Sequence, residues 1–414
     1  MDQGTAAKSA IAALGIKRWE FITLAAALMA TNSLAIDIML PALQQIGASL
    51  GVANENHRQY VLTSYIVGFG AAQLFFGPIS DRFGRRKPLV IGLVLYVAAA
   101  AAAAIAPTFE LLLLSRFIQG IGTAGTRVIA VSMIRDVFEG RRMAEVMSLI
   151  FMVFMAVPVV APAMGQLIML FATWHYIFVA MAVGGVVVSV WSLRRLPETL
   201  APENRRPFTA AAVLGGFRVV LTNRIALCYT LAGTFIYAGM FGFINSAQQI
   251  YMGIYGVGGM FSVIFAAVAG LLALSNYSNS RFVGRFGMRR MSQAALFLFL
   301  AISLVWLGLS LLMPIPLILF IAIFASAMIP FGALGANFNA LAMEPLGWLA
   351  GTASSFLGFT QTLAGGILGT LIGQAFDGTV TPLAAGFCIV SLAALAMVLI
   401  AERGRLFQPH NPPM

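Results

Sequence analysis

One acidic residue, Asp37, lies inside a long apolar run, where a charged carboxylate is energetically costly. The run extends from Phe21 to Ile46, and Asp37 alone among the 14 acidic residues lies deep in such a run. A charged Asp at mid-membrane costs about 2.5–3.5 kcal/mol on insertion scales, so it is a functional candidate. A carboxylate whose surroundings alternately favour and disfavour its charge can load and release a proton. We therefore take Asp37 as the candidate proton carrier, with a fixed buried ion pair as the alternative.

Two arginines lie inside another apolar run, at Arg116 and Arg127. At 1.5 Å of rise per residue, Asp37 and Arg116 lie roughly 14 Å and 10 Å from the outer ends of their runs, so Arg116 is a candidate partner for Asp37. Arg127 follows nearly three helical turns later and shares the face of Arg116. Two arginines on one face indicate a polar, water-lined side that could meet substrate. For Arg127, snorkelling or a helix–helix hydrogen bond is an equal alternative.

Two segments contain glycine or proline at notable places: one joins the ends of two apolar runs, and the other lies in the middle of a run. GPISDRFGRRKPL, over Gly77–Leu89, could latch two helices in one state through its charges and tight turn, or could simply anchor the chain at the membrane surface. Its distinctive members are Gly77, Asp81, Arg82, Gly84, Arg85 and Arg86. VPVVAPAMGQ places Pro158, Pro162 and Gly165 in the middle of a run, which suits a bending or sealing helix as well as an ordinary membrane kink.

Aromatic and amide residues within the apolar runs could line a substrate cavity, although each is more simply a packing or interhelical contact. They are Tyr65, Phe154, Tyr237, Phe241, Asn245 and Gln361. The three histidines and two cysteines form no metal-ligand pattern, and there is no Walker A sequence or Ser-His-Asp set. We therefore expect no catalytic residues, metal or cofactor, and no ATP-driven pumping.

The elements that must position these residues follow from composition. The chain has 414 residues, of which 60% are apolar and only 9% charged. Soluble domains carry about 25% charged residues, so a soluble protein, a disordered chain and a basic nucleic-acid binder are all excluded. The apolar runs predict twelve membrane-spanning helices. In lipid only helices and closed β-barrels satisfy every backbone hydrogen bond, and these runs lack the alternation of apolar and polar residues that barrel strands show. They cover residues 21–46, 59–81, 89–106, 109–135, 144–170, 174–193, 222–247, 257–280, 291–313, 315–343, 351–376 and 382–401.

The positive charge of the chain is distributed unevenly among the loops. With the N-terminus placed in the cytoplasm, the inner loops and ends hold 22 Lys and Arg residues and the outer loops hold one, Arg58. This split predicts that both termini are cytoplasmic. It also explains the net charge of +11 by membrane orientation, with no nucleic-acid partner.

The two halves of the sequence repeat each other. RFGRRK at Arg82–Lys87 recurs as RFGMRR at Arg285–Arg290, 203 residues later. We predict an all-helical protein of two pseudo-symmetric six-helix bundles, a common architecture of secondary transporters. The bundles comprise residues 1–193 and 222–414, the second with a short cytoplasmic tail, and residues 194–221 form a cytoplasmic linker.

Four motifs together resemble the major facilitator superfamily, and within it the twelve-span drug:proton antiporters of the Bcr/CflA group. They are AIDIMLPAL at Ala35–Leu43, GPISDRFGRRKPL, RFIQG at Arg116–Gly120, and APAMGQ in the fifth span, accompanied by WHYIF at Trp174–Phe178. The resemblance covers about residues 20–402. In the fifth-span motif Ala161 replaces a common glycine, which puts only the local packing in doubt.

The resemblance implies roles for individual residues. Asp37 is implied as the carboxylate linked to proton and substrate, Arg116 as its support in proton coupling, and Asp81 with Arg82 and Arg85 as the inner latch. Ser33 and Phe154 are implied to border the drug cavity. Two departures limit the resemblance: Met29 stands where some related exporters carry a second membrane acid, and Gly284 replaces Asp81 in the second copy of the loop, whose latch we expect to be weaker.

The leading hypothesis is therefore a proton-driven antiporter that exports small amphipathic drugs, of the chloramphenicol or bicyclomycin kind or more lipophilic, by alternating access. It is expected in a bacterial-type inner membrane, as a monomer, with protons, substrate and lipid as its partners. The alternative is a proton-coupled transporter of one physiological metabolite, since superfamily membership does not fix the substrate. A membrane enzyme or sensor is disfavoured, because one Asp and two Arg supply little material for catalysis.

Overall fold

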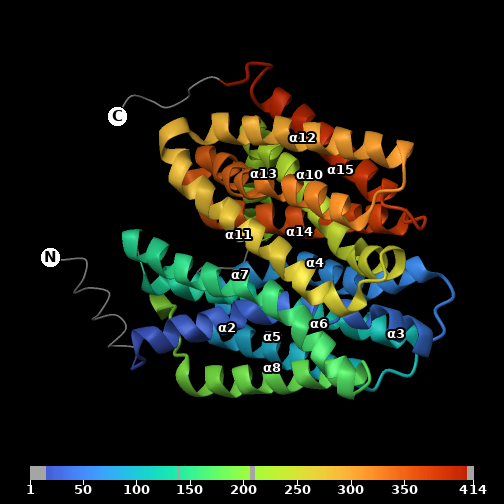
Figure 1. The fold of residues 1–414 in the computed structure, drawn as a ribbon. Helices are drawn as coiled ribbons and strands as arrows, with labels where there is room; N and C mark the ends of the chain where they lie inside the picture. Colours follow the sequence, from blue (N-terminus) through green and yellow to red (C-terminus); the bar gives the residue numbers. More distant parts are fainter. Residues whose placement is uncertain (1–14, 139, 206–209, 408–414) are drawn as a thin grey trace. The chain divides into compact units, whose positions relative to one another are not determined.

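The computed structural model describes residues 15–138, 140–205 and 210–407, apart from some side chains in α7, in the linker and near the start of α14. Over those ranges the chain is helical and has no strand. It divides into two compact units, which we describe separately (Figure 1). Unit 1 comprises Met1–Ala53 and Ser64–Val213, and unit 2 comprises Asn54–Thr63 and Leu214–Met414.

Unit 1 is built mainly from the helices of the first half of the sequence. Their bounds are α2 (Arg18–Asp37), η1 (Leu40–Ala42), α3 (Leu43–Ser49), α4 (Tyr60–Phe83, of which Tyr60–Thr63 belong to unit 2), α5 (Arg86–Ala104), α6 (Phe109–Val137), α7 (Gly140–Phe171), α8 (His175–Arg195) and η3 (Pro202–Asn204).

Unit 2 holds the remaining helices. Their bounds are η2 (Glu55–Gln59), α9 (Ala210–Thr222), α10 (Arg224–Gln248), η4 (Gln249–Ile254), η5 (Gly258–Met260), α11 (Phe261–Phe286), α12 (Met288–Leu312), α13 (Leu317–Met343), η6 (Glu344–Leu349), α14 (Ala350–Gln374) and α15 (Thr381–Ala401). The short helix α9 overlaps the predicted linker, residues 194–221, and ends one residue beyond it; its residues 210–213 belong to unit 1.

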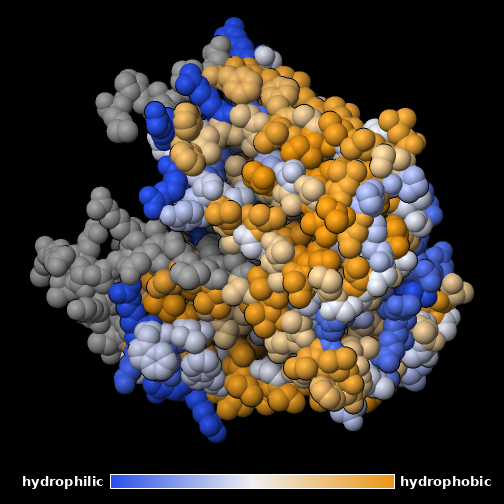
Figure 2. Space-filling view, in the orientation of Figure 1, coloured by the Kyte–Doolittle hydropathy of each residue, from blue (hydrophilic) through white to orange (hydrophobic). Residues whose placement is uncertain are grey.

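The membrane-spanning character predicted from composition is confirmed. In the described residues, eleven helices are long and apolar enough to cross a membrane, and Ala156–Phe171 within α7 is a shorter apolar stretch. Large apolar side chains are exposed along these helices, for example Val183 at 58% and Leu371 at 61%. Figure 2 shows much of this apolar surface in orange. Such a surface is suited to lipid rather than water.

The two units pair their helices by the same scheme. In unit 1, α2 packs against α6, α7 and α8, and α5 packs against α6 and α8. In unit 2, α10 packs against α13, α14 and α15, and α12 packs against α13 and α15. The repeated R-F-G loops also share their turn, because Gly84 and Gly287 both have positive φ values, of 87° and 81°. The pseudo-symmetry predicted from the sequence repeat is therefore present in the fold.

Candidate functional site

Helix α2 ends at Asp37, within the first membrane span. The cause lies in the sequence: Pro41 has no N–H to offer the carbonyl of Asp37, and its ring would clash with that carbonyl in a continuing helix. The chain instead enters the short turn η1, which contains Pro41, and then α3. The apolar run 21–46 predicted an unbroken span, although Pro41 is a sequence signal for the break.

The Asp37 side chain is buried at the end of α2, with 4% of its surface exposed. Its Oδ2 accepts a hydrogen bond from the Ser33 hydroxyl at 2.9 Å, one helical turn earlier. An exposed carboxylate would be solvated by water, whereas within the described part of the chain the Ser33 hydroxyl, from the same helix, is its hydrogen-bond partner. This arrangement leaves Asp37 available for a proton or a substrate group.

Helix α7 packs closely against the chain just after Asp37. A Cβ atom placed on Gly165 would lie 1.8 Å from the carbonyl oxygen of Ile38, so only glycine fits. Pro158 and Pro162 lie within the same continuous helix α7, one to two turns before this contact. The glycine of the fifth-span motif, Gly165, therefore packs against the helix break that follows Asp37. The sequence did not predict this contact.

Arg116, in α6, is fully buried in unit 1. Its guanidinium donates to the Ala35 carbonyl at 2.9 Å and to Gln119 Oε1 at 2.5 Å, and it lies 4.4 Å from the ring centroid of Tyr65. The Tyr65 hydroxyl in turn donates to Asn32 Oδ1 at 2.9 Å. Through Ala35, Arg116 holds the backbone of the last turn of α2, two residues before Asp37.

Small residues bring α4 and α6 into backbone contact beside this cluster. A Cβ on Gly120 would lie 2.1 Å from the Tyr65 carbonyl oxygen, and one on Gly68 would lie 2.1 Å from the Phe117 carbonyl oxygen. Gly120 belongs to the RFIQG motif, so the motif's glycine places Arg116 over the Tyr65 ring. Arg127 lies further along α6, with its guanidinium 5.6 Å from the ring centroid of Phe69.

The remaining predicted cavity residues are divided between the units. Tyr237 and Phe241 lie on α10 in unit 2, where both are partly buried and Tyr237 packs edge-on against Phe331. Asn245 donates to the Phe241 carbonyl at 2.8 Å, and Gln361 donates to Asn339 Oδ1 at 2.6 Å. The Asn245 bond lies within α10, whereas the Gln361 bond joins α14 to α13. The side chain of Phe154 lies outside the described residues.

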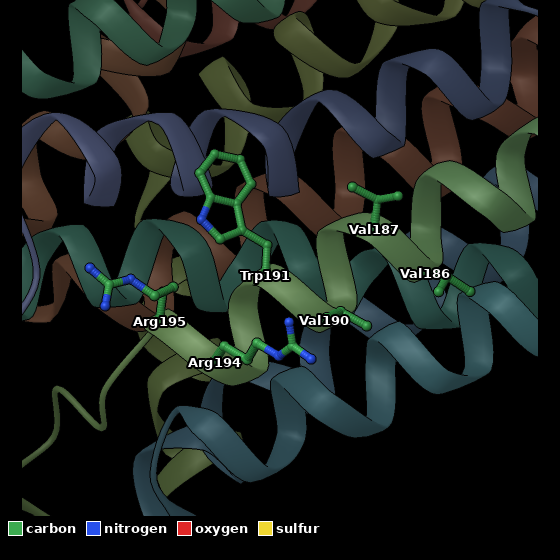
Figure 3. Close-up of a pocket in the computed structure, with 6 residues that line it drawn as sticks. All are labelled: Val186, Val187, Val190, Trp191, Arg194 and Arg195. Atoms are coloured by element: carbon green, nitrogen blue, oxygen red, sulfur yellow. The ribbon is translucent and has the colours of Figure 1, made fainter.

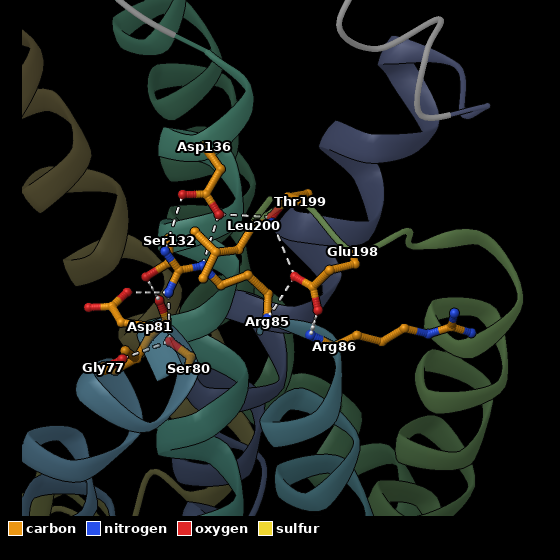
Figure 4. Close-up of polar contacts among 11 residues, drawn as sticks. Gly77, Ser80, Asp81, Arg85, Arg86, Ser132, Asp136, Glu198, Thr199 and Leu200 are labelled. Carbon is orange, nitrogen blue, oxygen red and sulfur yellow. Dashed lines mark hydrogen bonds and ion pairs between the residues drawn. The ribbon is translucent and has the colours of Figure 1, made fainter. Parts of the chain in front are cut away.

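Arg85 is the centre of the predicted latch (Figure 4). Its guanidinium forms a two-pronged pair with Asp136, at 2.8 and 3.2 Å, and contacts Asp81 at 2.5 Å and Ser80 Oγ at 2.8 Å. Burial alone lowers the pKa of Arg85, but the hydrogen bonds and charges of Asp136 and Asp81 outweigh it and raise the pKa above its usual value. Arg85 therefore stays protonated throughout the physiological pH range.

Other members of the predicted latch lie at its edge. Gly77 accepts a hydrogen bond from the Ser80 hydroxyl, and Arg82 is exposed with its guanidinium 5.5 Å from the Phe83 ring centroid. Arg86 donates to the Leu193 carbonyl at 2.6 Å and thereby contacts the end of α8.

Sequence reasoning missed two carboxylates of this network, Asp136 and Glu198. Glu198 accepts hydrogen bonds from the backbone N–H groups of Arg85 and Arg86, at 2.8 and 3.1 Å, and so caps the start of α5 (Figure 4). Gly84 makes room for it, because a Cβ there would collide with the Glu198 carboxylate. In the sequence Glu198 stands in LPETL, directly after α8, within the segment predicted as linker.

Unit 2 has a comparable network despite Gly284. Arg289 donates to Glu344 at 2.8 Å and to Glu402 at 3.0 Å, and the Tyr229 hydroxyl donates to the same Glu402 oxygen at 2.7 Å. Glu344 and Glu402 directly follow α13 and α15. In unit 1 the corresponding acids are Asp136, in the last turn of α6, and Glu198, just after α8. The second loop therefore lacks an acid at position 284, but its Arg289 pairs with two carboxylates that are distant in sequence.

The chain is similar in sequence to known proteins over nearly its whole length. It is 30% identical to the bicyclomycin resistance protein homolog of Haemophilus influenzae, over 89% of this chain and 92% of that protein. It is 31% identical to the multidrug resistance protein MdtL of Escherichia fergusonii, over 94% of this chain and 98% of that protein.

The fold and a family profile agree with these relatives. The crystal structure of a D-xylose–proton symporter has the same fold, with a TM-score of 0.70 and 16% identity over 91% of this chain and 95% of that one. The sequence profile of the Major Facilitator Superfamily matches residues 22–370. With its duplicated helical units and its loop and helix motifs, the chain belongs to the Major Facilitator Superfamily of membrane transporters.

Proposed function

We propose that this chain is a proton-coupled antiporter that exports small, partly apolar drugs across a bacterial inner membrane. The observation that carries the proposal is Asp37, buried at a helix break inside a membrane span and supported by one hydroxyl. The names of the two relatives, which refer to resistance to bicyclomycin and to multiple drugs, support the choice of substrate class.

In this proposal Asp37 alternates between an ionised and a protonated state. The Ser33 hydroxyl stabilises the ionised carboxylate, and a protonated Asp37 gains an O–H donor that can bind substrate or the backbone. The Arg116 guanidinium donates a hydrogen bond to the Ala35 carbonyl, two residues before Asp37. A shift of α6 is therefore transmitted to the last turn of α2, which carries the Asp37 carboxylate. The Arg85 network acts as the cytoplasmic latch.

The remaining parts of the proposal follow from charge and composition. Both termini lie in the cytoplasm, because 22 of the 25 basic residues fall in the inner segments. The chain works as a monomer, without a cofactor and without catalysing a reaction, and the proton gradient supplies the energy.

The test is proton movement driven by substrate. Purified protein is reconstituted into liposomes containing a pH-sensitive dye, a pH gradient is imposed, and bicyclomycin, chloramphenicol and a lipophilic dye are added in turn. We expect at least one compound to accelerate dissipation of the gradient, with no effect in protein-free liposomes. If none of them moves protons while a cellular metabolite does, the drug-export proposal is wrong and the metabolite alternative replaces it.

A further inference from the structure

Helix α8 carries a groove on its exposed face. The cavity has a volume of about 400 Å³ and is lined by Val186, Val187, Val190, Trp191, Arg194 and Arg195 (Figure 3). The valines are exposed, with 59% of Val187 and 46% of Val186 accessible. Since α8 is a membrane-spanning helix, this face lies against lipid. The groove therefore has apolar walls at the depth of acyl chains and arginines at its C-terminal end.

One wall of the groove is fixed by a buried acid from α2. Glu20 is 7% exposed, and its carboxylate forms a two-pronged pair with Arg195 at 2.6 and 2.7 Å. The same Glu20 accepts a hydrogen bond from the Trp191 indole N–H at 3.4 Å. Trp191 and Arg195 are thus held in place, while the side chain of Arg194 points away from Arg195, toward Val190 (Figure 3).

The charge at this end of unit 1 is strongly positive. Six basic residues belong to the neighbouring ends of α2, α5 and α8, namely Lys17, Arg18, Arg86, Lys87, Arg194 and Arg195. The acids described beside them are already bound: Glu20 by Arg195, and Glu198 by the backbone N–H groups of Arg85 and Arg86. Asp81 and Asp136, at the same end of the unit, pair with Arg85. The groove thus opens at a net positive surface, on the side where the proposed topology places the cytoplasm.

We propose that this groove binds one anionic phospholipid of the cytoplasmic leaflet. An acyl chain lies along Val186, Val187 and Val190, against the Trp191 ring, and the phosphate meets Arg194. Val186 to Arg195 spans about 14 Å of helix, a length that suits the upper part of an acyl chain. An arginine recognises phosphate through paired N–H donors. A zwitterionic lipid is disfavoured because its own cation faces the basic cluster.

Native mass spectrometry of the detergent-purified full chain tests this site by titration with lipids of identical acyl chains. We expect phosphatidylglycerol to bind more tightly than phosphatidylcholine, and Arg194→Gln to weaken phosphatidylglycerol binding about fivefold, with a smaller effect on the already weaker phosphatidylcholine. The matched control is Arg281→Gln, which removes an exposed arginine on α11 that contacts Tyr277, and it should leave both affinities unchanged.

Two further measurements separate the parts of the site. Val187→Trp fills the groove while leaving every charge in place, and it should also weaken phosphatidylglycerol binding. Inorganic phosphate at the same concentrations should not compete. Equal affinity for the two lipids, unchanged binding in Arg194→Gln, or full competition by phosphate would each overturn the proposal. Lipid binding is read without transport, so this result is independent of the drug-export test.

Discussion

At the scale of single residues, the chemistry depends on where a charge is buried. Asp37 and Glu20 are the buried acids among the described residues, yet their surroundings differ. Glu20 is tied to a guanidinium by two hydrogen bonds, whereas Asp37 receives one from Ser33. A carboxylate in a strong ion pair keeps its charge, so of the two acids Asp37 is the better candidate for the proposed proton carrier.

This difference predicts the effect of Asp37→Asn. The amide keeps the size and most hydrogen bonding of the carboxylate but cannot exchange a proton. We expect a folded protein that no longer builds a drug gradient from a pH gradient, with at least a tenfold loss of proton-driven transport in proteoliposomes. Glu110→Gln, the same chemical change at an exposed site on α6, should have no effect. Proton-driven transport that survives in Asp37→Asn would remove Asp37 from the mechanism.

At the scale of helices, glycine positions decide how closely the elements of the site approach. A Cβ on Gly165 would lie 1.8 Å from the Ile38 carbonyl oxygen, so Gly165→Ala must push α7 away from the break after Asp37. We expect a loss of stability of about 1–3 kcal/mol, as for other overpacked sites, together with reduced transport. Thermal unfolding in detergent measures the first and proteoliposome flux the second.

The control for this change lies on another membrane helix. Gly184 in α8 has open space where a Cβ would stand, so Gly184→Ala should be neutral or slightly stabilising, as alanine favours helix. A Gly165→Ala variant as stable and active as Gly184→Ala would show that the close approach at Ile38 is unnecessary.

The cap that Glu198 provides to α5 gives a second prediction at this scale. Glu198→Gln retains one acceptor oxygen but loses the charge that favours the N-terminus of a helix. We expect the amides of Arg85 and Arg86 to exchange hydrogen about fivefold faster, equivalent to about 1 kcal/mol. Glu203→Gln, in η3 of the same linker, serves as control, and equal exchange rates in the two variants would contradict the capping role.

The helices themselves were predictable, whereas their contacts were not. The predicted spans 109–135 and 174–193 differ from α6 and α8 by two residues or fewer at each end, because apolar runs bounded by charge define a membrane helix. Asp136 and Glu198 were missed because they lie 51 and 113 residues from Arg85 in sequence, and hydropathy says nothing of which loops meet. The Asp37 break was foreseeable from Pro41, but the approach of Gly165 was not.

At the scale of the whole molecule, the distribution of basic residues predicts topology. Reporter proteins fused after Arg205 and at the C-terminus should read cytoplasmic, and one inserted near Asn54 should read external. Five predicted spans, the second to the sixth, separate Asn54 from Arg205, so opposite readings at the two sites test the span count as well as the orientation. A cytoplasmic signal at Asn54 would contradict both.

The number of available carboxylates predicts how the transporter responds to voltage. Glu20, an obvious second proton site, is bound by Arg195, and the side chain of Glu145 lies outside the described residues. We therefore expect one proton per cycle, carried on Asp37. Export of a neutral drug then moves one positive charge inward, and 100 mV, negative inside, adds about 2.3 kcal/mol, or roughly fortyfold in the attainable gradient.

A drug carrying one positive charge should behave differently, because its exit cancels the charge of the entering proton. Its export should follow the pH gradient and be indifferent to membrane potential. Potassium gradients with valinomycin set the potential in proteoliposomes at fixed pH, and a neutral drug in the same vesicles provides the comparison. If potential alone drives export of the cation, at least two protons must enter, and since Arg195 already engages Glu20, Glu145 becomes the first residue to replace.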